Sequence, residues 1–272
     1  MLASRPGKKI RGFSTSFFLF LILTVVPVVK SPDAGAAGAT LPLNLLRITP
    51  SGEDAQPGRQ VVFEFNRPVV PLGRMERDAS EIPVTFEPAL ACQWRWLNPS
   101  SLACQLDEKN ALAPATRYRL IVRPGIRAED GATLSGELHH TFVTQRPKVV
   151  EARFKNWLSP GTPRIFLRFS QPVQEESAAA HLYFRLEGNP RVAAVLAEDP
   201  DYTQSADYIK GSIWLVTPAG ELPADKGVDF AVEPGILPVR GSEPGVERKS
   251  IFSFHTFPDF RFLGVRCSNR AG

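Results

Sequence analysis

Long helices, long apolar runs and catalytic signatures are largely missing from this sequence of 272 residues. From residue 40 onward, only 174–182 suggests one or two helical turns, and the 25 prolines spread along the chain favour strands and turns instead. The sequence has no P-loop, no G-x-G-x-x-G fingerprint and no G-x-S-x-G elbow. We therefore expect a chain that is not an enzyme and that binds no cofactor.

A charge excess is also missing once the N-terminal segment is set aside. The chain has 32 Lys and Arg residues against 28 Asp and Glu, but residues 1–36 hold five of the bases and one of the acids. The remainder is close to neutral. The basic isoelectric point of the whole sequence therefore gives no support for a nucleic-acid or anionic-membrane partner.

Residues 1–36 have the layout of a secretory signal peptide. Basic residues precede an apolar run at 17–29, and small-x-small cleavage sites end at Ala36 and Ala39. The alternative is an uncleaved membrane anchor, but the run is short for a span of about 20 residues and Pro27 interrupts it. We expect an exported protein, periplasmic or extracellular, with no membrane segment after cleavage.

Only three cysteines are present: Cys92, Cys104 and Cys267. Export permits a disulfide, and the turn signal at 98–101 lies between Cys92 and Cys104. A short hairpin there would pair the two thiols, the alternative being two buried free cysteines. The spacing, without neighbouring His or Cys, does not fit zinc. Cys267 would pair with another chain or with residues that this chain lacks.

An internal repeat is what the sequence does contain. VFEFNRPVV at 62–70 corresponds to FLRFSQPVQ at 166–174. In both copies an alternating strand then runs into Pro-Gly-Ile, and a glycine-containing loop leads to a closing strand. The offset between copies drifts by only a few residues, as loop insertions would cause. We interpret this as a tandem duplication joined at 146–147, with the later matched strands at 118–122 and 228–232, and at 140–144 and 252–256.

Two tandem immunoglobulin-like antiparallel β-sandwiches are the predicted all-β fold, because each copy has roughly 100 residues and many short strands. We place them at 43–146 and 147–258, followed by a tail at 259–272 that ends as a truncated segment. The run from Leu112 to Tyr118 (L-x-P-x-T-x-Y) matches a tyrosine corner, in which the Tyr hydroxyl bonds to upstream backbone. The second copy has Val228 instead, so its corner must be held in another way or be looser.

The remaining polar candidates favour surface positions over a metal site. His139 and His140 are adjacent on a predicted strand and so point to opposite faces. Two acid pairs would offer oxygen ligands for Ca²⁺, but their spacing fits no known ligand loop. We expect no metal site among the isolated histidines and acid pairs, which are His181, His255, Glu175, Glu176, Asp199 and Asp201.

The four tryptophans divide into core and interface candidates. Trp94 and Trp96 lie on one face of a predicted strand at 92–96, and Trp214 lies in an alternating strand. Aromatic residues in sandwich strands are usually core, and the alternative for the pair is a partner-binding patch. Trp157 lies in an apparent loop, FKNWLSPG, and is the expected interface residue. A carbohydrate-binding module is a weaker alternative that rests only on Trp94, Trp96 and Trp157.

The stretch from Pro50 to Val70, which ends in R-Q-V-V-F-x-F-N-x-P-V-V, resembles the start of bacterial alpha-2-macroglobulin family proteins. The continuation is also similar, through C-Q-W-R-W at 92–96, Cys104, and the second copy from Phe154 to Val173. The resemblance covers about residues 45–262 and is stronger in the first copy.

This resemblance implies a non-enzymatic N-terminal scaffold part of a periplasmic protease inhibitor. Members are much longer chains that surround a protease once it cuts a bait segment, so the implied partners are downstream macroglobulin domains or target proteases. No C-x-E-Q thioester motif and no bait-like segment is present, so we expect a fragment that cannot trap proteases alone. The alternative is a free-standing immunoglobulin-like binding or stalk module for a protein partner in the cell envelope.

Overall fold

The computed structural model describes residues 42–262, apart from 71–75, 78, 189 and 207, together with residues 264 and 265. The predicted signal peptide, its cleavage positions and Cys267 lie outside these residues. The described chain is nearly all-β, as predicted, with one short α-helix, α1 (Glu175–His181), and one 3-10 helix, η1 (Ala79–Glu81). None of the helices in this described part is long and apolar enough to cross a membrane.

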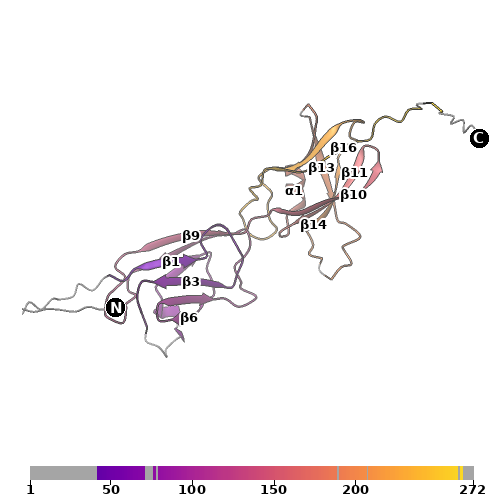
Figure 1. The fold of residues 1–272 in the computed structure, drawn as a ribbon. Coiled ribbons are helices and arrows are strands. Elements are labelled where there is room, and N and C mark those ends of the chain that lie inside the picture. Colours follow the sequence, from indigo (N-terminus) through magenta and orange to yellow (C-terminus); the bar gives the residue numbers. More distant parts are fainter. Residues whose placement is uncertain are drawn as a thin grey trace, which may run out of the picture. The chain divides into compact units, whose positions relative to one another are not determined.

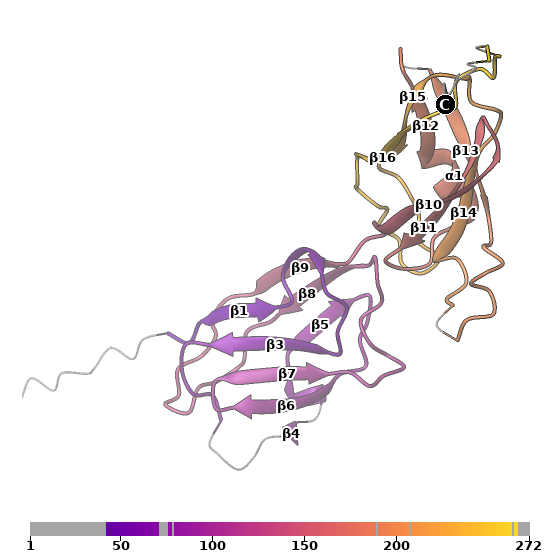
Figure 2. The ribbon, with the colours of Figure 1, turned by 45° about the vertical axis from the view of Figure 1, so that its right-hand side comes forward.

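The first sandwich consists of two sheets, visible in Figures 1 and 2. One has the strand order β1-β3-β7-β6-β4 and the other β2-β9-β8-β5. Neighbouring strands are antiparallel except for β2 and β9, which are parallel. The strands are β1 (Leu45–Thr49), β2 (Gly52–Ala55), β3 (Gln60–Phe65), β4 (Glu76–Arg77), β5 (Val84–Glu87), β6 (Gln93–Asn98), β7 (Ser101–Gln105), β8 (Arg117–Val122) and β9 (Leu138–Thr144).

Alternation along β3 builds the first core. Val61, Phe63 and Phe65 are buried, as their period of two predicts. The rings of Phe63 and Phe65 each lie 5.8 Å from a tryptophan of β6, Trp94 and Trp96 respectively, and both tryptophans are buried. The predicted core role of this pair therefore fits the structure, and a carbohydrate site built on these two rings is excluded.

The hairpin of β6 and β7 contains a disulfide between Cys92 and Cys104, whose Cα atoms are 4.8 Å apart. The side chain of Asn98 accepts a hydrogen bond from the backbone N–H of Ser100 (2.9 Å) and helps to close the turn. Cys104 is fully buried. The disulfide therefore ties the segment just before β6 to strand β7, at a buried position of the first core.

The second sandwich is one seven-stranded sheet folded over on itself, in the order β10-β11-β14-β13-β12-β15-β16. Each neighbouring pair is antiparallel, and β13 pairs with β14 on one side and with β12 on the other. The fold-over leaves β10 and β16 as the two edge strands. The strands are β10 (Val149–Ser159), β11 (Thr162–Phe169), β12 (Leu182–Leu186), β13 (Arg191–Ala197), β14 (Ile213–Pro218), β15 (Gly227–Val232) and β16 (Lys249–His255).

One sequence prediction about this sandwich is wrong, and one side chain departs from the alternation of its strand. Trp157 lies in strand β10 and not in a loop, because β10 continues to Ser159 before it turns into β11. Alternation with Ile165 and Leu167 would place Phe166 on the outer face of β11, yet it is buried. Its ring is covered by Tyr202, whose ring is 4.8 Å away, and by the Arg153 guanidinium, 4.3 Å from the ring centre.

The core of each sandwich is separate. Buried apolar residues between Leu43 and Phe142 form one cluster, and those between Val149 and Ile236 form the other. In the second cluster the rings of Phe184 and Phe230 stack at 5.0 Å. The two copies therefore fill their interiors independently, which fits the predicted duplication; the exact boundaries stay a prediction.

The first sandwich has the predicted tyrosine corner. The hydroxyl of Tyr118 accepts a hydrogen bond from the backbone N–H of Ala113 (2.9 Å). The Tyr118 side chain is buried, and this burial raises the pKa of its hydroxyl. The hydroxyl therefore stays protonated over the physiological range.

In both copies a threonine at, or directly after, the end of the closing strand holds the corner. The second copy uses this threonine without a tyrosine. The Thr144 hydroxyl donates to the Ala113 carbonyl (2.7 Å) and accepts from the Thr116 N–H (2.9 Å). In the second copy the Thr256 hydroxyl donates to the Pro223 carbonyl (2.7 Å) and accepts from the Lys226 N–H (2.9 Å). We call this arrangement the threonine latch.

Candidate protein-binding surface of the second sandwich

A β-bulge in β10 decides where Trp157 points. Phe154 pairs with Ile165 and Trp157 pairs with Pro163, and the register shift between these pairs makes Lys155 the extra residue. Paired residues point to the same face of a sheet. Because Ile165 and Pro163 are buried, Phe154 and Trp157 share the inner face although they are three residues apart.

The inner face is open at this point because β10 and β16 are edge strands. The Trp157 ring lies 5.5 Å from the ring of Phe154, 5.8 Å from that of Phe254 in β16, and 5.0 Å from that of Phe257. The aromatic cluster thus bridges the seam between the two edges. Phe154 is 43% and Phe257 49% exposed, so the cluster offers apolar surface to a partner.

We call this end of the second sandwich the exit end, because the chain leaves β16 here. It comprises Phe154, Trp157, Phe254, Phe257 and the loop 222–226. Exposed apolar residues continue from it along the chain on both sides. Exposed apolar side chains that gather on a domain mark protein–protein or membrane interaction sites or ligand-binding grooves. These additional residues are Leu158, Phe260, Phe262 and Val265.

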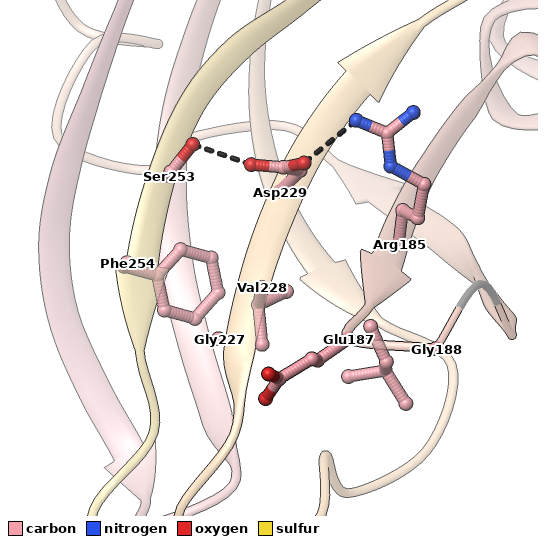
Figure 3. Close-up of a pocket in the computed structure, with 9 residues that line it drawn as sticks. Arg185, Glu187, Gly188, Gly227, Val228, Asp229, Ser253 and Phe254 are labelled. Atoms are coloured by element: carbon pink, nitrogen blue, oxygen red, sulfur yellow. Dashed lines mark hydrogen bonds and ion pairs between the residues drawn. The ribbon is translucent and has the colours of Figure 1, made fainter.

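A shallow groove of about 470 Å³ adjoins the aromatic cluster and is shown in Figure 3. It is lined by the ends of β12, β15 and β16, with the ring of Phe254 on one side and the carboxylate of Glu187 on the other. Arg185 and Ser253 both point to the carboxylate of Asp229. The groove therefore offers apolar surface beside a row of polar groups.

This polar row is internally satisfied. Asp229 accepts a hydrogen bond from Arg185 Nη2 (2.6 Å) and another from the Ser253 hydroxyl. The bond from Arg185, with a smaller effect of Ser253, lowers the pKa of Asp229, and the same ion pair raises that of Arg185. An ionised carboxylate already occupied by a guanidinium is a poor general base, so the row orients the strands and does not activate Ser253.

The four histidines contact backbone carbonyls or carboxylates. His140 Nε2 lies 2.9 Å from the Pro50 carbonyl and His181 Nδ1 lies 2.7 Å from the Ser177 carbonyl. His139 and His255 lie beside the carboxylates of Glu137 and Asp225. A nucleophilic triad requires the imidazole to contact a hydroxyl or thiol, which none of these contacts supplies.

The acid pair Asp199 and Asp201 holds a cation that belongs to the chain itself. The Lys155 ammonium, placed by the bulge, lies 2.5 Å from Asp199 Oδ1 and 2.7 Å from Asp201 Oδ2. Burial alone would lower the pKa of Lys155, but its hydrogen bonds to the two carboxylates raise it. The hydrogen bond from Lys155 in turn lowers the pKa of Asp201. Lys155 therefore occupies one oxygen of each carboxylate, while Asp199 Oδ2 is buried without a hydrogen-bond partner.

The other acid pair, Glu175 and Glu176, lies in the first turn of α1. Carboxylates at this position complement the partial positive charge of the helix N-terminus. Within the residues that the structure describes, no three His, Cys, Asp or Glu side chains gather as metal ligands would.

Sequence reasoning identified one member of the exit end, Trp157, and missed its neighbours. Phe254 and Phe257 lie about a hundred residues from Trp157 in the sequence. The bulge at Lys155 puts Phe154 on the same face as Trp157, and the sequence does not reveal it. The repeated phenylalanines of 252–257 were the available signal. The other predicted pair, Cys92 and Cys104, lies in the first sandwich and takes no part in this surface.

Comparison with known proteins gives only weak structural likenesses. No protein-family model matches the sequence and no curated protein matches it. Among solved structures, native alpha-2-macroglobulin from Escherichia coli, spanning domains MG0-NIE-MG1, is 15% identical, with a TM-score of 0.30, over 71% of this chain and 79% of that one.

An L,D-transpeptidase from Mycobacterium tuberculosis H37Rv is also 15% identical, with a TM-score of 0.26, over 68% of this chain and 75% of that one. L,D-transpeptidase 3 from the same species, in complex with a faropenem-derived adduct, is 14% identical, with the same TM-score, over 68% and 76%. Scores this low give no argument for a shared family or activity.

Proposed function

We propose that the chain is a non-enzymatic scaffold part of an exported alpha-2-macroglobulin-like protease inhibitor, and that its exit end binds another protein. The resemblance of residues 50–70 and 92–104 to that family supports the scaffold assignment. The aromatic cluster around Trp157 supports protein binding at the exit end and is the observation that carries it. Tryptophan in a partly open apolar site is typical of residues that dominate protein–protein binding energy.

Export is part of this proposal. The Cys92–Cys104 disulfide supports it, because such bonds persist in oxidising compartments. The test is the intact mass of the chain recovered from the cell envelope or medium of its source. We expect a mature N-terminus just after Ala36 or Ala39, and an uncleaved chain in the cytoplasm would contradict export.

Protein binding at the exit end is tested by site-specific photo-crosslinking in the native envelope. A photoreactive amino acid replaces Phe257 in one variant and Leu46, which is 67% exposed in the first sandwich, in the control. We expect a discrete crosslinked protein from position 257 that position 46 does not give. The same products from both positions, or none, would count against the proposed surface.

A protease-capture assay distinguishes a scaffold part from a complete inhibitor. The mature chain is incubated with a broad-specificity protease, and cleavage of a large protein substrate is measured. We expect no protection, because the sequence has neither a thioester motif nor a bait-like segment. Protection by this chain alone would show that the scaffold assignment is wrong.

A further inference from the structure

The loop that precedes β8 holds a segment of the second sandwich. The Ala115 carbonyl oxygen accepts hydrogen bonds from the N–H groups of Ser242 and Glu243, each 2.8 Å. Gly241 approaches so closely that a Cβ there would lie 2.3 Å from the Pro114 carbonyl oxygen. This loop of the first copy is therefore one side of a contact between two sandwiches.

Charge matches the two sides of this contact. Glu243 accepts hydrogen bonds from Arg117 Nε (2.8 Å) and Nη2 (3.0 Å) and from Arg146 Nη2 (2.8 Å). Glu53 also contacts both arginines, so the first copy presents one positive charge in excess. The hydrogen bonds, that from Arg117 first, lower the pKa of Glu243. A loop with excess positive charge therefore holds an acidic segment.

The loop that precedes β15 is the same loop in the second copy, and it lies at the exit end. Asp225 corresponds to Ala115: both have left-handed backbones (φ 55° and 45°), and the N–H of each donates to a carbonyl just after the closing strand, at 3.0 Å in both. Gly227 begins β15 where Arg117 begins β8. The second copy therefore has an exposed carboxylate in this loop and lacks the arginine.

Carboxylates outnumber bases around this second loop. Glu187, Glu221 and Asp225 are exposed beside one base, Lys226, and three acids minus one base leave two negative charges in excess. The ion pair in the adjoining groove adds no net charge. Among the groove residues drawn in Figure 3, the Glu187 carboxylate has no hydrogen bond or ion pair, and it faces the ring of Phe254 across the groove. The exit end should therefore bind a basic segment with apolar neighbours.

The tail that follows the exit end is such a segment. Residues 259–272 hold three arginines and one aspartate, an excess of two positive charges. Phe260 and Phe262 flank Arg261 and are 102% and 80% exposed, so neither ring is covered by its own sandwich. In an extended chain the two rings share one face and Arg261 points to the other. The tail therefore offers apolar and basic groups on separate faces.

These two faces match the exit end. Phe254 belongs to both the aromatic cluster and the groove wall, so a tail laid along it can place its phenylalanines against the cluster and Arg261 over the groove. A guanidinium there meets the Glu187 carboxylate and the face of an aromatic ring. Asp259, on the same face as Arg261, then has Lys226 as its counterpart. Lys226 lies beside Glu187, because the Glu187 N–H donates to the carbonyl of the residue after Lys226 (3.1 Å).

We propose that the exit end of one molecule binds residues 259–262 in the tail of a second copy of this chain, and that the second copy returns the contact. The proposal rests on the exit end being a protein-binding surface, and it names the partner. Phe154 and Phe257 stay exposed in the single molecule, so its own tail does not cover the aromatic cluster. Because the tail and the receiving surface lie at the same end of the sandwich, two copies can exchange tails about a two-fold axis, which closes the interface at a dimer.

Sedimentation velocity of the mature chain over a range of concentrations tests this. Every protein carries Cys267→Ser, so dimers joined through that thiol cannot form. Glu187→Arg or Arg261→Glu, both at exposed positions, brings like charges together, and each should raise the dissociation constant of the dimer at least about tenfold. Glu108→Arg, the same change at an exposed position of the first sandwich, is the control and should dimerise as the parent does.

Mixing the two variants is the decisive measurement. In a mixed dimer the unchanged Arg261 of one variant meets the unchanged Glu187 of the other, and the two substituted side chains, which are opposite in charge, meet at the second contact. The mixture should therefore form 1:1 dimers at concentrations where each variant alone is monomeric. A variant that had merely unfolded would not recover in this way.

Three results would overturn the proposal: a parent that stays monomeric up to about 1 mM, dimers that neither variant weakens, or a mixture that stays monomeric. The first includes the case in which the tail folds onto its own exit end. Crosslinks from position 257 to a different protein would still support the proposed function, which is therefore judged separately.

Discussion

Thr144 and Thr256 occupy the same place in the two copies. The single hydroxyl of each bonds to both ends of the short loop that precedes β8 or β15. Thr256 is almost fully buried. Its hydroxyl is the partner of one carbonyl and one N–H, and a buried polar group left without a partner costs about 1–3 kcal/mol. In the first copy the Tyr118 hydroxyl supports the same loop through Ala113, so the second copy depends more on its threonine.

Thr256→Val should therefore lower the free energy of unfolding by about 1–3 kcal/mol, because it removes the hydroxyl at nearly constant volume. Thr256→Ser, which keeps the hydroxyl, is the matched control and should lose less. Urea unfolding followed by fluorescence measures both. Equal stability of the valine and serine variants would show that the hydroxyl is not what holds the loop.

The close approach of Gly241 to the carbonyl oxygens of Pro114 and Ala115 can be tested by adding a single carbon atom. Gly241→Ala adds a methyl group that would lie 2.3 Å from the Pro114 carbonyl oxygen and 2.4 Å from that of Ala115, so the loop must move away. We expect faster amide hydrogen exchange at Ser242 and Glu243.

The matched control for this change is Gly131→Ala. It has a similar positive φ but nothing within 4 Å of the added carbon, so it carries the backbone strain without the clash. If both variants left the exchange of Ser242 and Glu243 at the wild-type rate, the close approach of Gly241 would not be a determinant of the contact.

At the scale of elements, the β6–β7 hairpin and strand β10 show two ways in which a strand is fixed. The hairpin is closed by a covalent bond between residues 12 apart in sequence. β10 is fixed by an irregularity, since the bulge at Lys155 turns Phe154 and Trp157 to one face and sends the lysine to Asp199 and Asp201.

Reduction of the Cys92–Cys104 bond should destabilise the first sandwich by about 2–3 kcal/mol, since closing a loop of this length restricts the unfolded chain by roughly that amount. The measurement is urea unfolding with and without a reductant. A Cys92→Ser/Cys104→Ser variant should match the reduced protein and be insensitive to reductant. An unchanged midpoint on reduction would contradict a stabilising role for the bond.

The strands were predictable from sequence wherever one face is buried and the other is not. β3 is such a strand, and its period of two gave the inward residues Val61, Phe63 and Phe65 correctly. The same rule failed at Phe166, because a distant loop containing Tyr202 covers the outer face. Trp157 was predicted in a loop and not by this rule, and the bulge that adds one residue to β10 has no local signature in FKNW. Period alone does not report which faces a later loop will cover.

At the scale of the whole molecule, Glu243 links the two copies and makes their contact sensitive to acid. Its folded pKa is lowered from an ordinary value of 4.5. The stabilisation from its ionised form is therefore complete above pH 4.5 and is lost as the pH falls further, through the folded pKa.

Glu243→Gln removes this titration. The free energy of unfolding of the wild type should exceed that of the variant at pH 7 by about 1.5–3 kcal/mol, as expected for hydrogen bonds to a charged group, and the difference should shrink as the pH falls below 4.5. Urea unfolding from pH 3 to 7 checks this. A difference that stays constant over that range would show that the carboxylate charge is not responsible.

The duplication was readable from sequence, but the contacts that give each copy its own role were not. Arg117 and Glu243 are 126 residues apart, and nothing local in either segment pairs them. The same applies to Trp157 and Phe257, which meet only because the seven-stranded sheet folds over. The residue types at the exit end were visible, whereas their convergence depends on the closure of the sheet.

The relative direction of an early strand and the last strand in each sandwich has a mechanical consequence. In the first sandwich β2 and β9 run in parallel, and in the second β10 and β16 begin near each other, where Lys249 contacts Val149, and end where Trp157 contacts Phe254. The chain therefore enters each sandwich at one end and leaves at the other. Tension applied between the termini would load many interstrand hydrogen bonds in shear at once instead of peeling them singly, so each sandwich should resist stretching as a unit.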